Sequence, residues 1–218
     1  MSKTILYLRT DICNEELTAG GSVAHTLGVI QGFSDLGYNV LCASSCMQKL
    51  LKKQTLNTLI VLKNPDWLSF LRWKINCFLS SFFFFFQLRT LVKNQNVLFI
   101  YQRYSLLNMS GVLLKWVFKK KLILEYNGSE AWIATHWIIK KRWLTFEWLM
   151  KKVEHINIKH ADTIIVVSEV LKHELLGQGV SKDKILVNPN GVNAQIYKPE
   201  IIIKKGGGEY ANNYYNVS

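Results

Sequence analysis

Short apolar runs alternate with longer amphipathic segments along most of this chain, and this alternation limits the possible folds more than any other feature. Short, nearly continuous apolar runs are typical of strands buried on both faces, as in parallel sheets covered by helices. We predict strands at residues 4–8, 39–43, 59–62, 97–101, 122–126, 163–167 and 185–187. The sequence therefore predicts an α/β fold, a doubly wound Rossmann-like parallel sheet with helices on both faces.

The segment after the first strand has a helical period. Val23, Leu27, Ile30 and Phe33 recur at spacings of three and four, which predicts a helix over residues 22–36 that Gly37 ends. Further helices are expected within residues 66–93, 106–119, 134–160 and 169–177. Because ligands of doubly wound sheets bind beyond the carboxyl ends of the strands, we expect functional residues in the loops after strands.

Residues 1–200 are expected to form one domain. Residues 201–218 are rich in Gly, Asn and Tyr and have no apolar period, so they are interpreted as a low-complexity or truncated tail.

Cys13, Cys42, Cys46 and Cys77 have no paired spacing, which favours free thiols over a zinc site or a disulfide framework.

The chain has 27 Lys and Arg against 15 Asp and Glu, and residues 47–93 and 115–160 hold nearly all of the excess. Both segments are also rich in large apolar residues, among them Trp67, Trp73, Trp132, Trp137, Trp143 and Trp148. This mixture suits a lipid headgroup surface better than a nucleic acid groove, so we predict an anionic membrane partner and no nucleic acid. The alternative interpretation is that the tryptophans fill the core and the lysines form a solvated face.

Residues 75–88 form an uncharged run of fourteen, shorter than the roughly 20 residues that cross a bilayer, and are expected to be a buried or interfacial helix. The N-terminus has no signal-peptide pattern. We therefore expect a cytoplasmic protein, peripheral on the inner face of the membrane if the charge serves lipid.

Gly20 and Gly21 open the first helix. Glycine lets a ligand approach the backbone, and helix N-terminal amides favour an anion such as a diphosphate, although a glycine pair is also a plain turn signal. The GxGxxG fingerprint is absent, which disfavours a NAD-dependent dehydrogenase. His25, one turn into the helix, lies off the apolar stripe and is either a ligand-facing or an ordinary surface histidine.

Polar residues also follow the fourth and fifth predicted strands. Arg103, next to Tyr104, either clamps a phosphate or carboxylate of a ligand or pairs with a structural carboxylate. Asn127 and Glu130 occupy a tight turn that either holds sugar hydroxyls or is an Asx turn in which Ser129 caps the next helix.

The order and spacing of several short motifs resemble the N-terminal half of a glycosyltransferase family 4 enzyme, from Ile5 to about Pro199. The motifs are Gly20-Gly21 with His25, Leu36-Gly37-Tyr38-Asn39-Val40, Ala161-Asp162, Val167-Ser168-Glu169, Lys184-Ile185 and Pro189-Asn190-Gly191-Val192.

The resemblance implies the GT-B arrangement, in which two Rossmann-like domains transfer a sugar from a nucleotide diphosphate donor with retention and without a metal or other cofactor. The N-terminal domain mainly holds the acceptor and the C-terminal domain the donor. By position, Gly20 and Gly21 would face the donor diphosphate, and Asn190 and Gly191 would mark the crossing into the second domain. Where the family often has a histidine this chain has Asn127, which cannot act as a general base.

The resemblance implies that the family's residues for the leaving diphosphate belong to a C-terminal domain that this chain lacks. We therefore predict an acceptor-side domain with little activity alone, which needs a C-terminal partner and acts on a glycan or lipid-linked acceptor. The expected catalytic residues are Asn127 and Glu130, and the expected substrate-binding residues are Gly20, Gly21, His25, Arg103, Tyr104, Asn190 and Gly191. The alternative is a degenerate, non-catalytic module that docks on a membrane or on a partner transferase.

Overall fold

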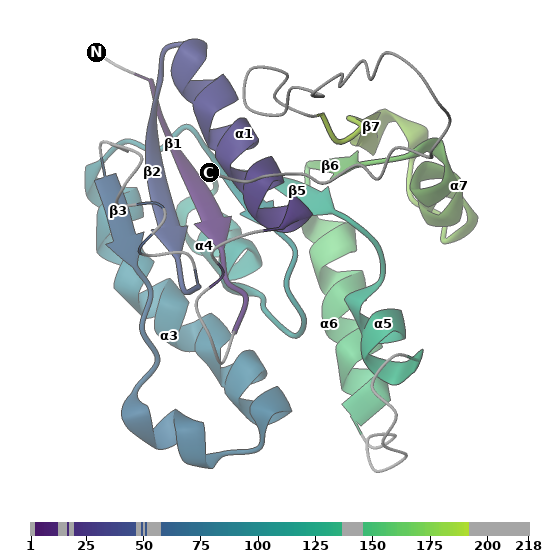
Figure 1. Cartoon of the computed structure of the whole chain (residues 1–218), viewed down its shortest axis with the longest axis horizontal. Helices are drawn as coiled ribbons and strands as arrows, with labels where there is room; N and C mark the ends of the chain where they lie inside the picture. The colour runs from purple at the N-terminus through teal and green to yellow at the C-terminus, as the bar shows by residue number, and fades with distance from the viewer. Residues whose placement is uncertain are drawn as a thin grey trace, which may run out of the picture.

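A computed structural model describes residues 3–12, 17, 20–46, 49, 51, 58–136 and 146–191. Within these residues, parallel strands form one seven-stranded sheet in the order β3-β2-β1-β4-β5-β6-β7 (Figure 1). The strands are β1 Lys3–Arg9, β2 Tyr38–Ser44, β3 Thr58–Val61, β4 Phe99–Arg103, β5 Lys121–Tyr126, β6 Thr163–Val166 and β7 Ile185–Val187. The predicted doubly wound parallel sheet is confirmed.

The strand order reverses at β1. From β1 the chain first builds β2 and β3 on one side, and it then returns to place β4 to β7 on the other side. In sheets of this kind ligands bind at the carboxyl edge next to the reversal, here between β1 and β4. The fold therefore directs attention to the loops that follow β1, β4 and β5.

Helices cover both faces of the sheet. They are α1 Gly21–Asp35, α3 Trp73–Asn94, α4 Ser110–Phe118, α5 Glu130–His136, α6 Glu147–His160 and α7 Glu169–Gly177, with short 3-10 helices η1 Asp66–Phe70 and η3 Lys182–Lys184. Ile5 and Tyr7 of β1 pack with α1, whereas Leu6 and Leu8 pack with α3 and α4 on the opposite face. In Figure 1, α1 lies in front of the sheet and α4 behind it.

The apolar run at residues 75–88 forms the middle of α3. Phe84, Leu88 and Val92 point inward and are buried against the strands. By length and composition alone, α3 is the one described helix that would reach across a bilayer, with a mean hydropathy of 1.4. Its inner face is nevertheless part of the sheet's core.

Some boundaries differ from the sequence prediction. β4 begins and ends two residues later than the predicted strand at 97–101, because Gln102 and Arg103 continue the pairing with both neighbouring strands. Within the predicted helical region 134–160, α5 begins earlier and α6 starts at Glu147. The predicted tail at residues 201–218 lies outside the described residues, as do Trp137 and Trp143. Cys42, Cys46 and Cys77 form no disulfide within the described part of the chain.

Candidate functional site

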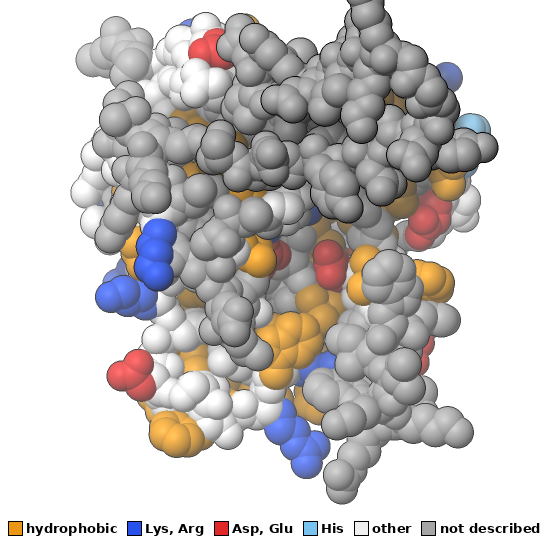
Figure 2. Space-filling model, in the orientation of Figure 1, with side chains coloured by type: hydrophobic (Ala, Val, Ile, Leu, Met, Phe, Trp, Pro, Cys, Tyr) orange, Lys and Arg blue, Asp and Glu red, His pale blue; other side chains and the backbone are white. Residues whose placement is uncertain are grey.

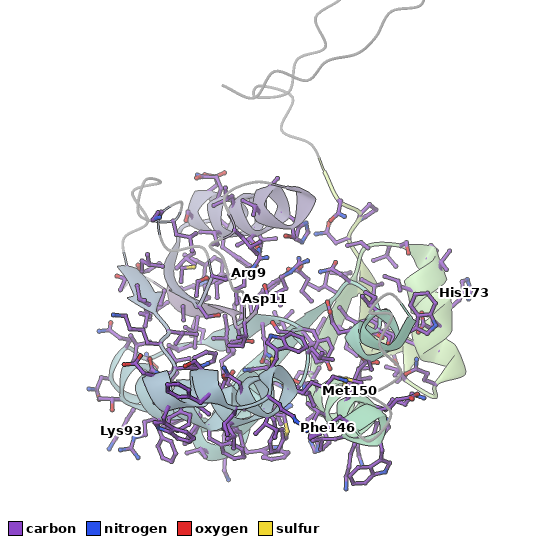
Figure 3. All side chains as sticks on the ribbon, turned by 60° about the horizontal axis from the view of Figure 1, so that its bottom comes forward. Arg9, Asp11, Lys93, Phe146, Met150 and His173 are labelled. Carbon is purple, nitrogen blue, oxygen red and sulfur yellow. The ribbon has the colours of Figure 1, made fainter. Side chains whose placement is uncertain are left out.

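Arg9 at the end of β1 organises the first turn of α1. This buried arginine donates from Nε to Asp11 Oδ2 (2.7 Å) and from Nη1 to Ser22 O (2.9 Å) and to Thr26 Oγ1 (2.6 Å). The other carboxylate oxygen of Asp11 accepts from Ser105 Oγ (2.8 Å), in the loop after β4. Figure 3 shows Arg9 and Asp11 close together beneath α1. These bonds fix the loops on both sides of the point where the strand order reverses.

The N-terminus of α1 is open at this edge. Gly20 has φ 111° and ψ 165°, in the region that favours glycine, and precedes a helix that has neither a side-chain cap nor an acidic residue in its first turn. A Cβ added at Gly20 or Gly21 would meet nothing within 4 Å among the described residues. Val23 N donates to Gly20 O (3.0 Å), so within the described residues the Gly21 and Ser22 amides remain for an anion, which the helix dipole would favour.

A buried carboxylate, Glu125, joins four side chains at the same edge. Its Oε1 accepts from Asn127 Nδ2 (2.7 Å) and from Arg103 Nη1, and it lies 3.3 Å from Nε2 of His25, without the alignment of a hydrogen bond. Its Oε2 accepts from the Tyr101 hydroxyl (3.1 Å). Three predicted site residues, from α1, β4 and the turn after β5, therefore meet on one carboxylate.

The charge of Glu125 is stabilised by these partners. Burial by itself would raise the pKa of this carboxyl, but His25, Arg103 and Asn127 together hold the pKa below its ordinary value. The side chains of His25 and Arg103 are 11% and 15% exposed, so each still reaches the surface at the carboxyl edge. Arg103 therefore makes the predicted pairing with a carboxylate of the protein while part of its side chain stays exposed at the carboxyl edge.

In the turn after β5, Ser129 caps the next helix, and the neighbouring Glu130 has a raised pKa. Ser129 Oγ accepts from Trp132 N (3.0 Å), which caps α5, and donates to Glu154 Oε1 (2.7 Å). Glu130, the first residue of α5, has no hydrogen bond to its carboxylate among the described residues. Burial raises the pKa of Glu130 to about 7, and the nearby Asp11 and Glu154 carboxylates add to this shift while Arg103 opposes it. Glu130 is therefore an acid that titrates near neutral pH.

The remaining predicted residues do not join the Glu125 cluster. Tyr104 is buried in the core, where its ring lies 6.1 Å from that of Tyr126. Asn190 and Gly191 are exposed beyond the end of β7, where the described chain leaves the sheet at the carboxyl edge. The turn at Asn127 to Glu130 thus contributes to the edge, whereas Tyr104 contributes to packing.

Sequence reasoning did not select Arg9, Asp11 or Glu125 as site residues. The available signal was a charged residue inside or directly after an otherwise apolar strand, since a buried charge requires a partner.

Within the described residues, no group of three His, Cys, Asp or Glu side chains is arranged to hold a metal ion. The surface in Figure 2 has acidic side chains next to hydrophobic ones near the middle of the visible face.

The sequence profile described as Glycosyltransferase Family 4 matches residues 19–196. The chain belongs to glycosyltransferase family 4. The match spans α1 with its open N-terminus, the Glu125 cluster and the segment after β7, whereas Arg9 and Asp11 lie before its first residue. No curated protein matches the sequence.

Solved structures support the fold of this family 4 chain. A sucrose-phosphate synthase from Thermosynechococcus elongatus is similar with a TM-score of 0.64 and 14% identity, over 91% of this chain and 50% of that one. A glycosyltransferase from Rickettsia africae has a TM-score of 0.58 and 20% identity, over 92% and 46%. A UDP-GlcNAc 2-epimerase from Neisseria meningitidis, bound to UDP-GlcNAc, has a TM-score of 0.57 and 10% identity, over 86% and 46%. The chain thus spans about half the length of these structures, and the likeness concerns the fold alone.

Proposed function

We propose that this chain is the acceptor-side domain of a retaining glycosyltransferase that uses a nucleotide diphosphate sugar and a glycan or lipid-linked acceptor. The observation that carries the proposal is the convergence of the open α1 N-terminus and the Glu125 cluster at the carboxyl edge of a family 4 chain. A C-terminal domain, in the same polypeptide or supplied as a partner, would complete the site. Asn190 and Gly191 would lead into it.

The donor diphosphate would lie against Gly20 and Gly21. The absence of a side-chain cap and of any Cβ at these positions leaves backbone amides for the phosphate oxygens, and the helix dipole adds positive potential. His25 and Arg103, held by the carboxylate of Glu125, would direct their exposed edges toward the phosphate or the sugar. Charge stabilisation of this kind needs no metal and no further cofactor.

Glu130 would handle the proton of the acceptor. The acceptor hydroxyl would approach the anomeric carbon from the face on which the phosphate leaves, so the configuration is retained. Its oxygen forms a bond to that carbon, while the bond from the carbon to the donor phosphate oxygen breaks and its electron pair leaves with the nucleoside diphosphate. The hydroxyl proton passes to the Glu130 carboxylate. A pKa of about 7 suits this role, because general bases work best with a pKa near the pH of the reaction.

The test is sugar transfer after a C-terminal family 4 domain has been fused behind Pro199. With a panel of labelled nucleotide sugars, Glu130→Gln should lower kcat/KM by about 100-fold, the lower end of typical acid-base contributions. Glu174→Gln, on the exposed side of α7, is the matched control and should leave transfer unchanged. Equal activity of Glu130→Gln and the parent fusion would contradict the assigned role.

A further inference from the structure

Three helices on one side of the sheet form a continuous outer layer. α3 and α4 pack side by side, and their inner residues share one core cluster. α4 contacts the C-terminal end of α6, where Lys115 Nζ donates to His160 O (2.7 Å) and the Trp116 ring meets that of His160 at 5.0 Å. Figure 3 shows α3, which ends near Lys93, and α6, which begins near Phe146, on the same side of the sheet. We call the solvent side of this layer the α3-α4-α6 face.

Large apolar side chains are exposed on the α3-α4-α6 face. Phe82 and Phe86 lie one turn apart on α3 and are 40% and 54% exposed. Trp116 and Val117 of α4 are 46% and 58% exposed, and Trp148 of α6 is 67% exposed. The interpretation that these tryptophans fill the core is therefore wrong for Trp116 and Trp148. Soluble monomers seldom keep such groups of exposed apolar residues unless the surface has a binding partner.

Basic side chains lie directly on these aromatic rings. The Arg89 guanidinium is 5.1 Å from the centre of the Phe86 ring, and the Lys152 ammonium is 4.5 Å from that of Trp148. At the end of α4, a hollow of about 320 Å³ is lined by Trp116, Asp162 and a group of lysines, Lys115, Lys119, Lys120 and Lys121. Asp162 pairs with Lys115 and Lys121. Lys119 and Lys120 have no acidic partner among the described residues, which leaves two charges for an external anion.

Acidic side chains do not offset this charge. On the three helices they are Glu147, which pairs with Lys151 at 2.7 Å, and Glu154, which is buried. The helix on the opposite side of the sheet, α1, has no Lys or Arg and ends at Asp35. The surplus of basic charge therefore lies on the same three helices as the exposed rings of Phe82, Phe86, Trp116 and Trp148.

We propose that the α3-α4-α6 face docks on an anionic membrane surface. Aromatic side chains insert at the headgroup level, and lysines and arginines with apolar stems bind lipid phosphates beside them. A second copy of the chain fits less well, because pairing two such faces would bring like charges together. A nucleic acid would leave the apolar side chains of Phe82, Phe86 and Val117 without a matching surface. The docking is independent of sugar transfer, so its failure would not bear on the proposed function.

Vesicle co-sedimentation of the full chain tests the proposal. Binding should require anionic lipid, such as phosphatidylglycerol in phosphatidylcholine, and should weaken as salt shortens the Debye length toward about 3 Å at 1 M. Lys119→Gln and Lys120→Gln should each lower the partition coefficient about fivefold. Phe86→Ser should lower it about tenfold, because the ring no longer inserts.

Leu36→Ser is the matched control, since Leu36 is 74% exposed at the end of α1 on the other side of the sheet. It should bind vesicles like the parent chain. A second measurement uses the parent chain and does not depend on whether a variant folds. Brominated lipid should quench the tryptophan fluorescence of the parent chain only when the vesicles are anionic. Equal binding to neutral vesicles at all salt concentrations would overturn the proposal. So would an equal loss in Leu36→Ser, or a dimer in solution that shields Phe86.

Discussion

Nε2 of His25, on the first helix, lies 3.3 Å from Oε1 of Glu125, at the end of the fifth strand, although the two residues are a hundred positions apart in sequence. Arg103 and Asn127 bind the same carboxylate oxygen. A single buried charge therefore sets the orientation of residues that approach the carboxyl edge from three different segments. Such a carboxylate holds these side chains in fixed positions at the carboxyl edge.

Removing the charge of Glu125 should destabilise the fold. Glu125→Gln keeps the shape of the side chain but leaves the Arg103 guanidinium without its anionic partner in a largely buried site. Breaking a buried ion pair in this way costs about 3 kcal/mol of unfolding free energy. Urea unfolding followed by circular dichroism measures this loss. The control Glu174→Gln should change it by less than about 0.5 kcal/mol, and an equally small change in Glu125→Gln would show that the carboxylate does not hold the cluster.

Stability should fall between about pH 4.5 and pH 7 because of Glu130. In the folded chain the pKa of this carboxyl is about 7, above its ordinary value of 4.5, so the folded state keeps a proton that the unfolded chain has released. The stabilisation is complete below the unfolded pKa and is lost as pH rises through the folded one, with a slope of up to about 1.4 kcal/mol per pH unit.

The difference between the parent chain and Glu130→Gln isolates this effect. The pKa of Glu154 is also raised, chiefly by burial, but that carboxyl is present in both chains and largely cancels in the comparison. Urea titrations at half-unit pH intervals should give a parent curve that declines more steeply than that of Glu130→Gln. Parallel curves would mean that Glu130 titrates at its ordinary pKa.

The fold was predictable because its determinants are local. Buried parallel strands are continuous apolar runs, and the helix after β1 has a clear period, so both are visible in one sequence. The boundary of β4 could not be predicted from the sequence, since Gln102 and Arg103 are polar and their strand conformation comes from pairing with β1 and β5.

The candidate site was predictable only in part. The segments after the predicted strands could be selected, and these contain Gly20, Asn127 and Arg103, although Arg103 is the last residue of β4 in the structure. The role of Glu125 depends on strand order, because β4 and β5 must be adjacent to place Arg103 directly opposite it in the register. The burial of Tyr104 in the core likewise depends on side-chain packing between distant segments, which the sequence does not indicate. Long-range pairing of this kind leaves no periodic signal in a sequence.

Asn127 and Ser129 should both contribute to stability, for different reasons. Asn127→Ala removes a hydrogen bond to a charged carboxylate and should cost about 2 kcal/mol. Ser129→Ala removes the cap of α5 and a hydrogen bond to Glu154, at a cost of about 1 to 2 kcal/mol. Asn127→Asp should be worse than Asn127→Ala, because it places a second carboxylate beside Glu125. Urea unfolding of the three variants tests the order, and Asn127→Asp as stable as the parent would contradict it.

The chain alone should bind nucleotide sugars weakly. In the proposed function, Gly20 and Gly21 supply only backbone amides for the diphosphate, and the contacts to the base and ribose belong to a second domain. Calorimetry with UDP, GDP and ADP sugars should therefore give dissociation constants near or above about 1 mM, or roughly −4 kcal/mol. Fusion to a C-terminal family 4 domain should tighten binding of one nucleotide class, and Gly21→Val should then weaken it by crowding the open helix N-terminus. A dissociation constant near 1 μM, about −8 kcal/mol, for the chain alone would mean that the donor site is complete in this domain, and the assignment of the acceptor side would be wrong.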